Sequence, residues 1–150
     1  MTDETWIDSD DFASGPFAPH GNFRMRVDDG VYRVEARGPF NEEAVLAWQA
    51  ARREMARRHP PAPGAVPRTV VHWIGSAMMS VQAFDRFAAG FHQFADQVHP
   101  LGAVAWVAEP DTEGVAMMAE HFRPLYESRH TRFAQFTDYA QALAWVEAVA

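Results

Sequence analysis

The chain has 150 residues, of which 48% are hydrophobic and 22% are charged, and it contains no cysteine. This length allows one domain with a sizeable core, and the composition is ordinary for a soluble globular protein. The lack of cysteine excludes disulfides, thiolate nucleophiles and cysteine-ligated zinc. No apolar run approaches the roughly 20 residues of a membrane span, so we expect a cytoplasmic protein.

The net charge is −7, and the first 21 residues carry acids but no Arg or Lys. A protein with this charge has no general attraction to nucleic acid or to an anionic membrane. The acidic start also differs from a secretory signal, which needs cations followed by an apolar run. We interpret residues 1–21 as a flexible acidic tail or a loosely docked strap, and residues 22–150 as a single domain.

The first regular elements are a hairpin and a helix. Residues 23–28 and 31–37 alternate apolar and polar side chains, as half-buried strands do. Between them, Asp29-Gly30 is typical of a tight hairpin turn. Asn41 is a good helix N-cap, and an apolar stripe then continues to about Arg58.

The middle of the chain predicts a strand, a helix and a second strand. Residues 69–74 and 101–108 are apolar runs of strand length. Between them, apolar residues recur at spacings of three and four, which indicates one helix face: Phe84, Phe87, Phe91, Phe94 and Val98. We expect Ser80 to cap this helix and Pro100 to end it. A stripe of this kind is more often core than ligand pocket.

The last third predicts a helix carrying Val115, Met118 and Phe122, which Pro124 should kink or end. A short strand at residues 132–136 and a final helix capped by Thr137 or Asp138 follow. The order is ββαβαβαβα. It predicts the α/β class, with a mixed, mostly parallel sheet of about five strands and helices packed on it.

With this order, residues 22–149 resemble a STAS domain, most closely the SpoIIAA-like (STAS/SEC14-type) proteins. The resemblance depends on residues 29–41, His72-Trp73, residues 103–107 and residues 136–146. It implies a mixed sheet with helices packed on it.

The resemblance also implies a regulatory serine at the start of the second helix, phosphorylated in the family within Asp-Ser-Ser-Gly. Here the matching stretch is Met79-Ser80-Val81-Gln82, so the acid, the second serine and the glycine are absent. Ser80 is therefore either a phosphosite equivalent or simply a helix cap.

Two groups of side chains are candidate contacts for a ligand or partner. Met78 and Met79, with Met117 and Met118, suit an adaptable apolar pocket. Arg53 and Arg57 belong to a cluster with Arg52 and Arg58 that could bind a phosphate or an acidic partner. The alternative for this cluster is complementation of the helix dipole, together with pairing to Glu54.

Several histidines could serve catalysis or metal binding. His92 shares a predicted helix face with Asp85, Asp96 and His99, but too few ligands are secure for zinc. His72 lies in an apolar strand, where a neutral buried histidine is the usual case. A small hydrolase using His72 or His92 with a serine is the alternative function, although no Gly-x-Ser-x-Gly motif frames a serine.

The sequence therefore predicts a STAS-like, non-enzymatic module that binds a partner protein or a small apolar or lipid ligand. We expect no metal, no cofactor and no nucleic-acid partner. A homodimer is compatible with this interpretation.

Overall fold

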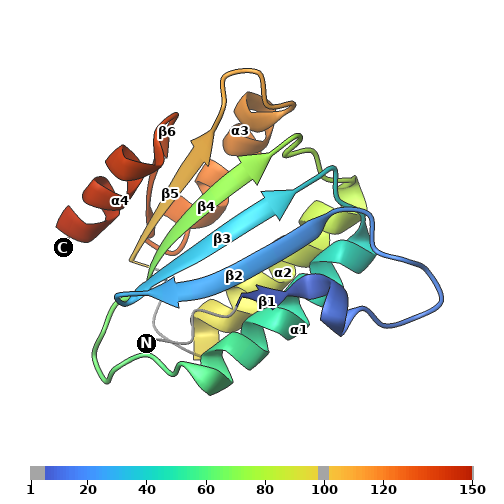
Figure 1. Cartoon of the computed structure of the whole chain (residues 1–150), viewed down its shortest axis with the longest axis horizontal. Coiled ribbons are helices and arrows are strands. Elements are labelled where there is room, and N and C mark those ends of the chain that lie inside the picture. Colours follow the sequence, from blue (N-terminus) through green and yellow to red (C-terminus); the bar gives the residue numbers. More distant parts are fainter. Residues whose placement is uncertain (1–5, 98–101, 150) are drawn as a thin grey trace.

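The computed structural model describes residues 6–97 and 102–149 (Figure 1). Its elements, in chain order, are β1 (Ile7–Asp8), the 3-10 helix η1 (Ser9–Phe12), β2 (Asn22–Asp28), β3 (Val31–Arg37), α1 (Glu42–Arg58), β4 (Arg68–Ile74), α2 (Val81–Gln97), β5 (Ala103–Ala108), α3 (Val115–Glu127), β6 (Arg132–Phe136) and α4 (Tyr139–Ala148). No helix in these ranges is long and apolar enough to span a membrane.

The strands form one six-stranded sheet in the order β1-β2-β3-β4-β5-β6. The pairs β1–β2 and β2–β3 are antiparallel, and every pair from β3 to β6 is parallel. The predicted α/β class, with a mixed and mostly parallel sheet, is confirmed. β1 is a sixth strand, beyond the five that alternation predicts, because two residues are too few to show a period.

The helices lie on both faces of the sheet (Figure 1). The strands β3, β4 and β5 each connect through one helix to the next strand of the sheet. Because such crossovers are right-handed and all step in the same direction along the sheet, their helices lie on one face. α1, α2 and α3 therefore share a face, whereas α4 packs on the other face against β4, β5 and β6. Alternate residues of one strand serve the two faces: Val71 packs under α1–α3 and Val70 under α4.

Of the two interpretations of residues 1–21, a flexible tail or a docked strap, the contacts of Ile7–Phe12 match the strap. Ile7 pairs with Met25 on β2 and is buried. The Ser9 hydroxyl accepts a hydrogen bond from the Phe23 amide at 2.9 Å and is also buried. These contacts outweigh the acidic, aperiodic composition, so this part of the segment is a docked strap.

The helix starts follow the predicted caps. Asn41 Oδ1 accepts the Ala44 amide at 3.0 Å, and Ser80 Oγ accepts the Ala83 amide at 3.0 Å. Asp138, rather than Thr137, caps α4.

The expectation that Pro124 could end the third helix is wrong, because α3 continues to Glu127. Proline removes only one helical donor. Leu125 and Tyr126, directly after it, are buried, so their packing offsets this loss. The predicted stop at Pro100 lies outside the described residues.

Candidate functional site

A cavity of about 590 Å³ lies between the sheet and the helices α1 and α2. Its volume is within the range of small-molecule sites, roughly 300–1,000 Å³. Most of its lining is apolar, with aromatic rings from three helices and three strands. This cavity is the strongest candidate for a functional site in the described part of the chain.

Side chains on the sheet face under α1–α3 form one side of the cavity. They come from β2, β3, β4 and β5, and they include Phe23, Val34, Val71, Trp73 and Val104. The open side of the site is near the amino ends of the parallel strands, where residues 61–65 precede β4 and Val104 lies at the start of β5. In open α/β sheets the usual ligand site is at the carboxyl ends, so the position here differs from that rule.

The phenylalanine stripe of α2 lines the opposite side. Phe87, Phe91 and Phe94 all contribute, while Phe91 is also one of the most buried side chains in the molecule. Phe122 of α3 contacts Phe87 with ring centroids 4.9 Å apart. The stripe is thus both core and cavity lining, two roles that its sequence spacing cannot separate.

The loop between α1 and β4 lines the remaining side. It contributes residues 61–65, which are proline, alanine and glycine and are all exposed. Because these side chains are small and reach solvent, the loop covers the cavity only thinly. We infer that ligands would enter on this side.

Close packing of α1 on α2 sets the width of the cavity. Gly90 faces Gln49, whose side-chain amide donates to the Arg86 carbonyl at 3.0 Å. A Cβ at Gly90 would clash with Nε2 of Gln49. An Arg86–Glu42 ion pair at 3.0 Å joins the same two helices near their starts.

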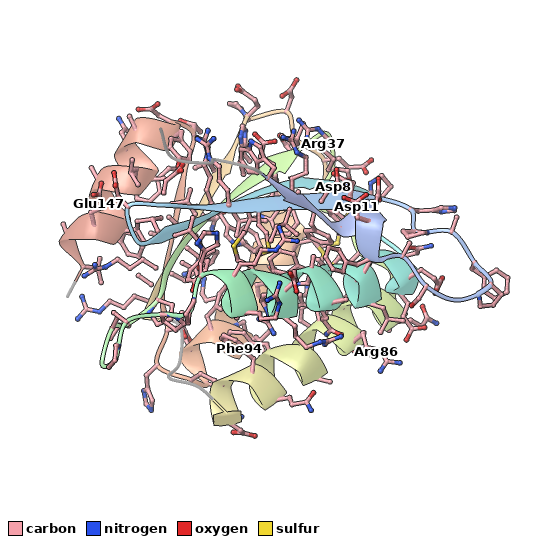
Figure 2. All side chains as sticks on the ribbon, turned by 60° about the horizontal axis from the view of Figure 1, so that its bottom comes forward. Asp8, Asp11, Arg37, Arg86, Phe94 and Glu147 are labelled. Atoms are coloured by element: carbon pink, nitrogen blue, oxygen red, sulfur yellow. The ribbon has the colours of Figure 1, made fainter. Side chains whose placement is uncertain are left out.

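One charged side chain enters this apolar lining from α1. Arg52 follows Trp48 and precedes Ala56 at helical spacing, and all three line the cavity. Its guanidinium lies over the ring of Phe94, 4.1 Å from the centroid. Burial lowers the pKa of Arg52 from its ordinary value to about 10, and the charge of Arg53 adds to this shift. Figure 2 shows Phe94 on the side of α2 that faces α1.

One residue of the lining has a donor without a partner in the described ranges, but this atom is buried in the packing and is not open to the cavity. Trp73 is buried and lines the cavity, and its Nε1 atom has no hydrogen-bond acceptor among the described residues. The acid in the lining, Asp96, is already engaged, because Arg129 Nη1 donates to its Oδ1 at 2.7 Å.

The residues predicted as ligand or partner contacts are outside this cavity. Arg57 is exposed and donates to Glu54, as does Arg58, and these bonds lower the pKa of Glu54 to about 2. Arg53 is exposed on the helix surface. The arrangement of Arg57 and Arg58 matches the alternative of pairing with Glu54.

The methionines Met78 and Met79 are near the carboxyl ends of the strands. Met79 is buried and forms an isolated β-bridge with Phe40. Met78 is partly buried, and its sulfur lies so close to Gly114 that a Cβ at that position would clash with it. Neither residue lines the cavity, so their predicted role in binding remains a prediction.

The predicted serine and histidines do not come together. Ser80 is exposed and caps α2, while Ser76 donates to Glu113 Oε1 at 2.7 Å. Across the described ranges, neither His72 nor His92 has a hydrogen bond to a serine. The hydrolase alternative has no assembled nucleophile and base here.

His92 is instead part of a small network with Arg129, whose Nε donates to His92 Nδ1 at 3.0 Å. Because a guanidinium only donates, Nδ1 accepts and the ring proton lies on Nε2. Within residues 6–97 and 102–149, no three His, Asp or Glu side chains are grouped as metal ligands. His99, named with the predicted metal-binding face, lies outside these ranges.

Sequence reasoning found Arg52 only as one of four neighbouring arginines. The signal that separates it is its position on the apolar stripe of α1, four residues after Trp48.

Comparison of the chain with protein-family models, with curated proteins and with solved structures finds no match.

Proposed function

We propose that this protein is a non-enzymatic binding module that holds a small apolar ligand between the sheet and helices α1 and α2. The observation that carries the proposal is the 590 Å³ cavity with its mostly apolar lining. A pocket of this volume can bury most of the surface of a drug-sized molecule.

The energetics support an apolar occupant. Removing apolar surface from water stabilises by about 25 cal/mol per Å². Phe87, Phe94 and Val71 line the cavity and are only partly buried, so a ligand that covers them would gain this free energy.

The non-enzymatic part of the proposal is supported by how the candidate side chains are used. The hydroxyls of Ser76 and Ser80 hydrogen-bond to neighbouring residues, and Nδ1 of His92 accepts from Arg129. None of these contacts forms the nucleophile–base pair that hydrolysis needs.

We also propose that the chain is a STAS-like module, on the residues that carry the resemblance. A cytoplasmic location and the lack of a nucleic-acid partner are proposals from composition and charge. The fold offers the same helix start for Ser80 as the resemblance requires, but the capping bond of Ser80 needs no phosphate.

An isothermal calorimetric titration of the protein with decanol tests the ligand proposal. We expect saturable binding with one site and a negative heat-capacity change, since apolar surface is buried. Native mass spectrometry of the freshly purified protein would identify any ligand that is already bound and the oligomeric state.

Two matched variants locate the binding. Ala56→Phe fills the cavity and should weaken decanol binding at least tenfold, because Ala56 lines it. Ala89→Phe places the same ring at an exposed position on α2 and should leave binding unchanged. Equal binding by both variants would contradict the proposed site.

A further inference from the structure

We propose that the ligand is an amphiphile with one apolar tail and a carboxylate head group, and that Arg52 binds this head group. The inference rests on the proposed function and deepens it by naming the ligand class. The observation behind it is a positive charge placed in an otherwise apolar cavity.

The charge of Arg52 has no counter-charge in the described structure. Its contact is the face of the Phe94 ring, which is neutral. Asp96 lines the same cavity but bonds to Arg129, and Glu54 on the same helix bonds to Arg57 and Arg58. Both carboxylates are therefore occupied by other arginines.

Several other arginines are paired, whereas Arg53, Arg123 and Arg132, which have no ion pair among the described residues, are exposed to water. Arg24 pairs with Glu35 at 3.4 Å, and Arg86 pairs with Glu42 at 3.0 Å. Removing an ion from water costs several kcal/mol unless a partner compensates it. A bound anion would supply that compensation at Arg52, in a place where a side chain of the protein does not.

The shape of the guanidinium favours a carboxylate. Its planar fork of donors matches two carboxylate oxygens in a bidentate pair. A carboxylate only accepts hydrogen bonds, so it complements the donors of Arg52, whereas an ammonium head group would be repelled by Arg52.

The rest of the lining indicates the chemistry and the size of the remainder of the ligand. Away from Arg52 the lining is built from rings and aliphatic groups, including Phe91, Val71 and Trp48. A volume of about 590 Å³ suits a drug-sized molecule, and therefore a single tail rather than two.

The alternative to head-group binding is that Arg52 covers apolar surface with its stem and extends its charge into water.

Three probes with one tail separate these cases: decanoate, decanol and decylamine, titrated calorimetrically at neutral pH. A hydrogen bond to a charged group contributes about 1.5–3 kcal/mol. We therefore expect decanoate to bind about tenfold to a hundredfold more tightly than decanol, with decylamine weakest.

Variants then assign the preference to one side chain. Arg52→Met should remove the preference for decanoate and leave decanol binding intact, which also shows that the cavity is still folded. Arg52→Lys keeps the charge without the fork and should retain part of the preference. Arg53→Met removes the neighbouring, exposed arginine and should retain all of it.

The outcomes are distinct. Binding of decanol as tight as that of decanoate, or a preference that survives in Arg52→Met, overturns the carboxylate assignment and leaves the apolar site standing. Failure of all three probes to bind the folded wild-type protein overturns the proposed function itself, and this inference with it.

Discussion

The two faces of the central sheet are packed in different ways. Under α4, the buried side chains are small and aliphatic, such as Val70, Ala105 and Val146. Under α1–α3 they are dominated by rings, including Trp73, Trp106 and Phe122. The aromatic rings meet mainly in tilted or edge-to-face contacts, the arrangement that their quadrupoles favour.

The cavity is on the ring-rich face, and its position is consistent with this difference. Trp73 meets Trp106 edge to face with centroids 4.9 Å apart. Phe91 and Tyr126 meet in the same way, 5.6 Å apart. The rings are fixed by one another, so the space beside them does not need to be filled for the fold to persist.

Among substitutions on the two faces, we expect Phe91→Ala, on the ring-rich face, to lower the free energy of unfolding the most. Phe91 is almost fully buried under the helices, and its loss should destabilise the protein by about 3–5 kcal/mol. Urea unfolding measures this change. A loss under about 1 kcal/mol would mean that the ring does not contribute to the core.

A smaller effect is expected on the aliphatic face from Val70→Ala. Val70 is fully buried under α4, and its two methyl groups contribute about 0.8 kcal/mol each, so we expect a loss near 2 kcal/mol. Urea unfolding also shows whether decanol still stabilises this variant as it does the wild type. Loss of decanol binding in Val70→Ala would indicate that the ligand binds on the α4 face of the sheet, which would contradict the proposed site.

Removal of the cap in Ser80→Ala should cost about 1 kcal/mol, because the Ala83 amide loses its acceptor. Ser80→Asp keeps a side-chain acceptor at the cap position and should restore most of the stability. Thermal unfolding compares the two variants. Equal destabilisation by both would contradict the capping role.

The smallest effect is expected for Arg57→Ala. Arg57 is exposed and its bonds to Glu54 are near the surface, where ion pairs contribute little. We expect no measurable change in unfolding and none in decanoate binding. Weaker decanoate binding in this variant would show that the arginine cluster, rather than Arg52, holds the head group.

The sequence predicted the element order and most boundaries to within a residue or two. The reason is that the longer elements have either a full period of apolar positions, as in residues 31–37 and the stripe of α2, or a continuous apolar run, as in β5. β1 was missed because it has two residues, and its pairing depends on β2. Pro124 was misjudged because burial of Leu125 and Tyr126 comes from tertiary packing.

The candidate site was less predictable than the fold. A cavity leaves no periodic pattern in the sequence. The spacing of the phenylalanines in α2 therefore predicted a core face, but not the cavity beside it. The spacing of Trp48, Arg52 and Ala56 was a usable signal, since it places a charge on an apolar helix face. Neither the lack of an acid beside Arg52 nor the pairing of Asp96 with Arg129 could be found from the sequence.

The most direct test of the ligand site is nuclear magnetic resonance of isotope-labelled protein with unlabelled decanol. We predict nuclear Overhauser effects from the decanol tail to Phe87, Phe91 and Val71, which line the cavity. Contacts confined to exposed apolar side chains such as Val81 and Met117 would contradict the proposed site.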